Sequence, residues 1–192
     1  YRYFLLREIP FGQDGDFSEE ALRSRLDADL ANALGNLVHR TLSMIGRYAQ
    51  GKVPPAGDVG CAVEDVPLRE AVAALPRTLD DAMAAVSFST ALEAIWRMVD
   101  EANRYIEQQA PWQLAKGPHQ VRLRTVLAVL AEVLRAIAIA LEPFMPSIAA
   151  DLWSQLGCGD RPRRLEDLAQ WPGVPAGQPI GQPRILFPKV ER

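Results

Sequence analysis

Residues 119–141 read HQVRLRTVLAVLAEVLRAIAIAL and consist mostly of Leu, Val, Ile and Ala. Polar residues form one narrow stripe that continues just past this run: Arg122, Thr125, Glu132, Arg135 and Glu142. A helix that is apolar on most of its sides is buried on most of its sides. We therefore expect this segment to form the central helix of a helical bundle. Its charged residues also argue against a membrane span.

A second long helix is predicted to begin at Ser18. Ser18 is a favourable N-cap residue, and Glu19 and Glu20 place negative charge in the first turn, where the helix dipole favours it. Apolar residues then recur at helical spacing and predict a face directed at the core. They are Leu22, Leu26, Leu30, Leu34, Leu37, Val38, Leu42 and Ile45. Gly51 and the prolines that follow it end this helix.

Two further helices are expected in the middle of the chain. Apolar residues have helical spacing over residues 68–85, although Pro76 argues for a break or kink after the first turns. Ser87 and Ser89 can cap a following helix that continues up to Pro111. Both helices would pack beside the central one.

The connecting segments are rich in Pro and Gly. Residues 51–66 have this composition and are acidic, so we expect a loop. A shorter helix over residues 147–156 ends at Gly157, and residues 158–192 form an irregular tail. The predicted fold is therefore all-α: a bundle of about five helices with an irregular Pro/Gly-rich C-terminal tail.

Length and composition fit one compact domain. The chain has 192 residues, of which 48% are hydrophobic, enough for a sizeable core. Lys and Arg number 21 against 24 Asp and Glu, and this net charge of −3 argues against indiscriminate binding to nucleic-acid backbone. Cys61 and Cys158 lie far apart without Cys or His neighbours, so we expect no metal site and favour a reducing cytoplasm. The first residues have no signal-peptide pattern.

Catalytic motifs are not found in the sequence. It has no GxxxxGK[ST], GxGxxG, GxSxG or HExxH pattern, and only His39 and His119 can serve as imidazole bases. Acidic neighbours such as Asp80 and Asp81 do not converge on one point of a helix. We therefore expect that this chain alone is not an enzyme.

Two polar features interrupt the helical pattern. Asn36 and Arg40 are one helical turn apart, and Trp112 directly follows Pro111. An amide and a guanidinium offer planar donors and an acceptor, and an indole offers a flat face for stacking. Together they suggest a site for a nucleobase. The alternative is structural, with a solvated helix face at the first two residues and a core or lid role for the tryptophan.

Four strings carry a resemblance to a known family. YFLLREIPFGQDGDFSEEAL begins at residue 3, DLANALGNLVHRTLSMI at residue 29, ANRYIEQQAPWQLAK at residue 102 and ILFPKVE at residue 185. In this order they resemble landmarks of the C-terminal half of the methionyl-tRNA synthetases, class I aminoacyl-tRNA synthetases. The resemblance covers essentially the whole chain. It implies an α-helical anticodon-binding domain at residues 18–157, preceded by a linker at residues 1–17 and followed by a tail at residues 158–192 that packs back on the bundle.

The resemblance also implies roles for single residues. The family's anticodon-reading Asn and Arg match Asn36 and Arg40, and its base-stacking Trp matches Trp112. The implied partner is methionine tRNA with its CAU anticodon, above all the cytosine at the first position. Cytosine needs donors for O2 and N3 and an acceptor for its amino group, which an Arg and an Asn supply together. Stacking contributes about 1–3 kcal/mol for any base, so discrimination is expected from the Asn and Arg.

The resemblance places the chemistry outside this chain. Neither a HIGH-like nor a KMSKS-like signature occurs here, so the catalytic domain of the same parent chain is an implied partner. The parent is a methionine–tRNA ligase that uses ATP and Mg, and no cofactor is expected in this chain. An alternative function is a free-standing synthetase-derived domain that acts as a protein-interaction scaffold. Peripheral RNA contacts are considered at four further residues: Pro111, Arg47, Arg104 and Lys116.

Overall fold

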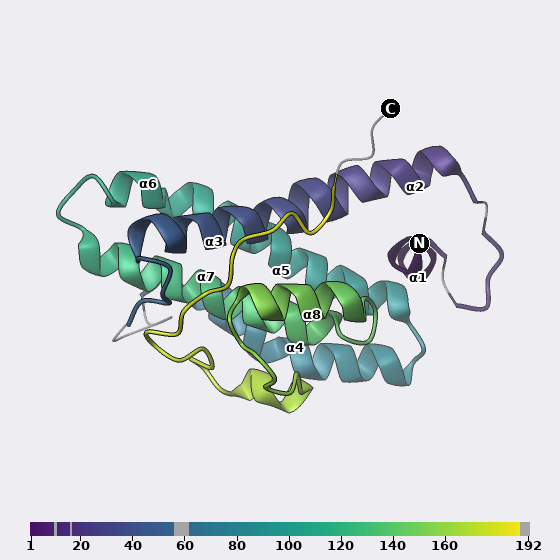
Figure 1. The fold of residues 1–192 in the computed structure, drawn as a ribbon. Coiled ribbons are helices and arrows are strands. Elements are labelled where there is room, and N and C mark those ends of the chain that lie inside the picture. The colour runs from purple at the N-terminus through teal and green to yellow at the C-terminus, as the bar shows by residue number, and fades with distance from the viewer. Residues whose placement is uncertain (10, 16, 56–61, 189–192) are drawn as a thin grey trace.

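The central helix of the protein is α7, Gln120–Leu141, and the other long helices surround it (Figure 1). The structure is a computed structural model that describes residues 1–9, 11–15, 17–55 and 62–188. From Val126 to Leu141 every residue of α7 is buried. The described residues contain no strand, only one isolated β-bridge between Lys52 and Pro179. The predicted all-α bundle with a buried central helix is confirmed.

Three helical segments follow one another in a single rod along one side of the bundle (Figure 1). They are α2 at Glu19–Arg25, the π-helical η1 at Leu26–Gly35 and α3 at Asn36–Tyr48. The Ser18 hydroxyl accepts a hydrogen bond from the Ala21 amide at 3.3 Å, which confirms the predicted N-cap. A π-helix bonds residues five apart. Accordingly, the Asn36 amide at its end donates to the carbonyl of Ala31.

The middle of the chain forms two long helices, α4 at Val66–Ala84 and α5 at Phe88–Gln109. Of the predicted break or kink at Pro76, a break is wrong, because Pro76 lies inside α4 and the helix runs through it. Five buried side chains on one face hold both halves of α4 in the core: Leu68, Val72, Leu75, Leu79 and Ala82. Burial of this face offsets the backbone hydrogen bond that a proline removes.

Three shorter helices complete the bundle: α6 at Pro111–Leu114, α8 at Pro146–Gln155 and the 3-10 turn η2 at Leu165–Ala169. Of these three helices, only α8 corresponds to a segment that the sequence predicts as helical. The chain turns sharply from α5 into α6 at Ala110, which has φ 42° and ψ 61°. This left-handed conformation is costly for a residue with a Cβ, and Pro111 then opens the new helix at its first position.

The C-terminal tail is fixed to the centre of α7 by a buried ion pair. Glu132 accepts hydrogen bonds from the amides of Gly173 at 2.8 Å and Val174 at 2.5 Å. The Arg135 guanidinium binds Glu132 at 2.9 Å and donates to the carbonyls of Asp167 and Gln170. Because both side chains are almost fully buried, 2% and 4% exposed, the tail completes the core.

A second buried polar group joins α4, α5 and α7. Asp65 is fully buried, and its carboxylate accepts hydrogen bonds from Tyr105 at 2.6 Å and from two nitrogens of Arg122 at 2.7 and 2.9 Å. Burial and the hydrogen bond to Asp65 raise the pKa of Tyr105. Asp65, the residue before α4, thereby binds the last part of α5 and the first turn of α7.

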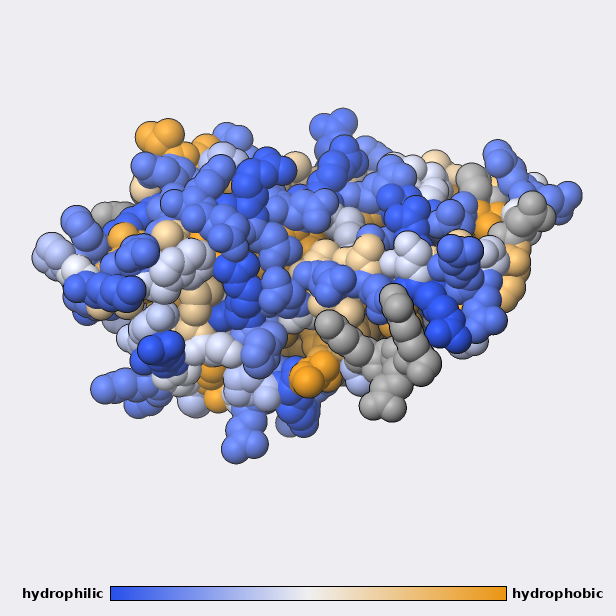
Figure 2. Space-filling model, turned by 90° about the horizontal axis from the view of Figure 1, so that it is seen from above, coloured by the Kyte–Doolittle hydropathy of each residue, from blue (hydrophilic) through white to orange (hydrophobic). Residues whose placement is uncertain are grey.

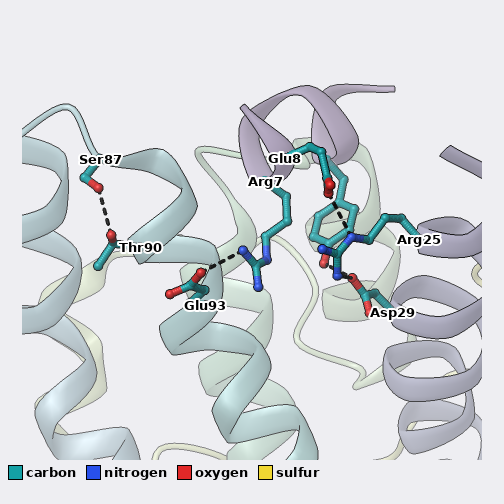
Figure 3. A network of polar contacts seen from close by, with 8 residues as sticks. Arg7, Glu8, Arg25, Asp29, Ser87, Thr90 and Glu93 are labelled. Carbon is teal, nitrogen blue, oxygen red and sulfur yellow. Dashed lines mark hydrogen bonds and ion pairs between the residues drawn. The ribbon is translucent and has the colours of Figure 1, made fainter. Parts of the chain in front are cut away.

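The first helix, α1 at Arg2–Glu8, packs on α5 and the rod. Tyr3 donates to the Asp29 carboxylate at 2.7 Å, and its ring lies 4.4 Å from that of Trp96. Arg25 pairs with Glu8 and also with Asp29 in the same network (Figure 3). Burial and the bond to Asp29 raise the pKa of Tyr3. Sequence periodicity did not indicate this helix.

Candidate nucleobase-binding site

Asn36 and Arg40 lie on the exposed side of α3, next to α5. Both line one shallow groove of about 430 Å³ between the rod and α5. The polar residues of this groove are Asn32, Asn36, Arg40, Asn103, Arg104 and Glu107. Because Asn36 is exposed, its side-chain amide is accessible to a ligand.

Trp112 is brought to the same place by the turn at Ala110. Its ring lies beneath the Arg40 guanidinium, whose central carbon is 5.6 Å from the ring centroid. Trp112 is half-buried and packs on one side against the main core. It therefore has both properties weighed from the sequence, a core contact and an aromatic face next to Arg40. Because the guanidinium lies over the ring, a base stacks there only after Arg40 moves aside, and it then comes within reach of the guanidinium.

Arg40 is held in place by an ion pair with Glu107 of α5. The two groups are 2.7 Å apart, with side chains 27% and 62% exposed. An exposed pair of this kind contributes little to the free energy of folding and can exchange partners with a ligand. Glu107 was not singled out in the sequence, although it stands five residues before Trp112.

Asn103 is a further groove residue that sequence reasoning did not assign. Its side-chain amide donates to the carbonyls of Ala33 at 3.2 Å and Val99 at 3.1 Å, so both hydrogens are used. Its oxygen Oδ1 is buried and has no hydrogen-bond partner. An unpaired buried acceptor costs about 1–3 kcal/mol, so Asn103 is a strained polar contact in the wall of the groove that also holds Asn36. Its position one turn before Glu107 on α5 is the sequence signal that was available.

The four peripheral candidates fall into two places. Arg104 lines the groove but pairs with Glu101 at 2.8 Å, and Pro111 is buried as the first residue of α6, directly before Trp112. Arg47 and Lys116 are exposed and lie outside the groove lining. The structure thus places Asn36 and Arg40 in one groove and brings Trp112 to Arg40, whereas two of the four peripheral candidates, Arg47 and Lys116, lie outside the groove lining.

The surface around the rod is hydrophilic over most of the face seen from above (Figure 2). Among the described residues, no three His, Cys, Asp or Glu side chains lie together as metal ligands would. In the same part of the chain, no helix has the length and apolar character that crossing a bilayer requires. Cys158 is a free thiol whose pKa is raised by burial, and Cys61 lies outside the described residues.

Comparison with known proteins places this chain in a family. Residues 69–179 match the family described as the anticodon-binding domain of tRNA ligase, and residues 1–42 match the family of class I tRNA synthetases (M). The first match covers more than half of the 192 residues. The chain belongs to the family of anticodon-binding domains of tRNA ligases.

Within this class the similarity is to methionyl-tRNA synthetases. The chain is 42% identical to a methionine–tRNA ligase of Caldanaerobacter subterraneus over 99% of its length, and 44% identical to that of Brucella melitensis over 98%. The free methionyl-tRNA synthetase of Mycobacterium tuberculosis has the same fold, with a TM-score of 0.91 and 39% identity. The resemblance read from the sequence is confirmed. The chain spans 30% and 36% of the two relatives, and 38% of the solved chain.

Proposed function

We propose that this chain selects methionine tRNA by reading its CAU anticodon in the groove between α3 and α5. The observation that carries the proposal is the approach of Arg40 to the Trp112 ring, 5.6 Å from its centroid, beside the exposed amide of Asn36. Trp112 stacks the first base, and Asn36 and Arg40 bond along its Watson–Crick edge. Pro111 supports the ring, and Arg47, Arg104 and Lys116 lie at the periphery.

The remaining parts of the proposal follow from the family. Residues 18–157 form the tRNA-reading bundle, residues 158–192 the tail, and residues 1–17 the linker to a class I catalytic domain. That domain, in a methionine–tRNA ligase of the cytoplasm that uses ATP and Mg, performs the ligation, and this chain supplies recognition only. The support is the match of residues 1–42 to class I synthetases, together with a relative solved in complex with methionyl-adenylate.

A binding titration tests the proposal with two RNA hairpins that copy the anticodon arm. One loop carries CAU, and the other carries UAU. Uracil still stacks but presents a different hydrogen-bonding edge, so the two loops should differ by about 1–3 kcal/mol, roughly 5- to 150-fold in Kd. Equal affinity for both hairpins would overturn the proposal and favour the scaffold alternative.

A substitution in the groove tests whether the groove produces the preference for the CAU hairpin. Asn36→Ala should reduce the preference for CAU over UAU. Ser43→Ala is the matched control, because Ser43 is exposed two turns further along α3 and outside the groove lining. A control variant that loses as much preference as Asn36→Ala would contradict the assignment.

A further inference from the structure

The basic residues of this acidic protein differ in whether they have a hydrogen-bond or ion-pair partner. Most described arginines have a carboxylate or carbonyl partner, as Arg40 and Arg122 do. Six described basic residues make neither an ion pair nor a side-chain hydrogen bond, and all six are exposed. These six are Arg47, Lys52, Arg69, Arg97, Lys116 and Arg124. Unpaired cations retain their full charge for a ligand.

Four of these six gather at one end of the bundle. A second, smaller apolar cluster closes this end, built around Ile45 and Leu127. Four residues in this cluster or packed on it are each adjacent in sequence to one unpaired cation: Tyr48, Val53, Ala115 and Leu123. The corresponding cations form what we call the cationic rim: Arg47, Lys52, Lys116 and Arg124.

The cationic rim begins where the base-reading groove ends. Arg40 and Arg47 lie seven residues apart on the same face of α3, about 10 Å along the helix. Lys116 follows Trp112 by one turn at the end of α6. On the acidic side, Asp65 at this end is neutralised by Arg122, and Glu64 beside it is exposed. Among the described residues at this end the charge balance is therefore positive, although the whole chain carries −3.

We propose that the cationic rim binds the phosphates of the RNA strand on either side of the anticodon. The inference rests on the proposed function, because the phosphates that flank a base on Trp112 lie close to this end, where Lys116 follows Trp112 by one turn. Cations that meet phosphates position the strand and raise affinity without reading bases. Arg69 and Arg97 belong to α4 and α5, away from the groove lining, and have no such role.

The test compares two variants of equal net charge, R47Q/K116Q in the rim and R69Q/R97Q outside it. Binding of the CAU hairpin is titrated between 50 and 200 mM salt. Each lost phosphate contact lowers the slope of log K against log salt by about 0.7–0.9, so the rim variant should lose about 1.5 of slope and bind several-fold more weakly at low salt. The control variant should keep the wild-type slope and affinity. Equal losses in the two variants, or none in the rim variant, would overturn the proposal.

The quadruple variant R47Q/K52Q/K116Q/R124Q extends the test. It should lower the slope by about 3 while the ratio of affinities for CAU and UAU hairpins stays as in the wild type. A thermal melt checks its fold, and the variant K52Q/R124Q serves where the quadruple one unfolds. Failure of base reading is seen separately, as equal binding of the two hairpins by the wild type, whereas the rim is judged by slope and affinity. An unchanged slope in K52Q/R124Q would remove these two residues from the rim.

Discussion

Two Arg–Glu pairs of nearly equal length have opposite surroundings. Arg135 and Glu132 are 2.9 Å apart in the core, with 4% and 2% of their side chains exposed. Arg40 and Glu107 are 2.7 Å apart in the open groove, with 27% and 62% exposed. In the core, backbone groups of the tail saturate both side chains, whereas in the groove water and ligands reach both. The same chemical pair therefore fixes the fold in one place and stays exchangeable in the other.

The largest effect is expected from Glu132→Gln. The substitution leaves the Arg135 charge buried without a counter-ion and weakens the acceptor for the amides of Gly173 and Val174. We expect the free energy of unfolding to fall by about 3–5 kcal/mol, measured by urea denaturation. The double variant E132L/R135M should lose less than the single one, since no charge is then stranded. A loss below about 1 kcal/mol in Glu132→Gln would show that the core pair is no different from an exposed one.

Alkaline pH offers a second way to test buried polar groups. The pKa values of Tyr3 and Tyr105 are raised in the folded state by burial and by hydrogen bonds to Asp29 and Asp65. Their contribution is intact below the unfolded pKa of about 10 and is lost as pH rises above it, because the unfolded tyrosines release their protons first. Unfolding at pH 11 should be easier by about 1.4 kcal/mol for each tyrosine.

The variant Y105F should show about half of the alkaline loss of the wild type, and Y3F/Y105F should show no tyrosine-linked loss. Urea unfolding at pH 9 and at pH 11 gives the free energy of unfolding at each pH. The change between the two pH values is then compared among the three proteins. The same pH slope in all three proteins would show that the two tyrosines are not responsible.

The groove is tested by Trp112→Ala. Loss of the stacking face should weaken binding of the CAU hairpin by about 1–3 kcal/mol, roughly 5- to 150-fold, as measured by titration. Trp112→Phe keeps an aromatic face and should lose less. Unfolding of the alanine variant instead of weaker binding would show that the core contact of Trp112 is its main role.

The smallest change in stability is expected from Glu107→Gln, the counterpart of Glu132→Gln in the other pair. Breaking an exposed pair should change the free energy of unfolding by less than about 1 kcal/mol. Arg40 is then free of its carboxylate, so affinity for the CAU hairpin should rise, by up to about fivefold. A destabilisation as large as that of Glu132→Gln would remove the distinction between the two pairs.

The long helices were predictable because their apolar stripes repeat at helical spacing. Leu22, Leu26, Leu30 and Leu34 predicted one helix but not its π-helical turns, since a spacing of four fits either form. The helical spacing of residues 68–85 was recognised, but the continuity of the helix through Pro76 was not predicted, because buried neighbours outweigh the local effect of a proline. The contacts of Glu132 with the tail could not be predicted, because residue spacing along α7 gives no information on backbone amides 41 or 42 residues further along the chain.

The candidate site was predictable only in part. The spacing of Asn36 and Arg40 places them on one face of a helix, which the structure shows as a groove wall. The approach of Trp112 depends on the left-handed turn at Ala110, a non-glycine residue that carries no sign of that conformation. The resemblance to a family supplied this contact. Asn103 was not predicted as a groove residue, because the orientation of its amide depends on hydrogen bonds to Ala33 and Val99, which its sequence neighbours do not indicate.

The clamp on α7 has a consequence for the order in which the protein folds as it is synthesised. The groups that saturate Glu132 and Arg135 lie 32 to 42 residues further along the chain. A ribosome therefore completes the central helix well before it delivers the amides and carbonyls that neutralise these side chains. During that interval the charged stripe of α7 remains hydrated, and the bundle stays open on this side. The tail closes this side of the core only after the residues that bind Glu132 and Arg135 have been synthesised.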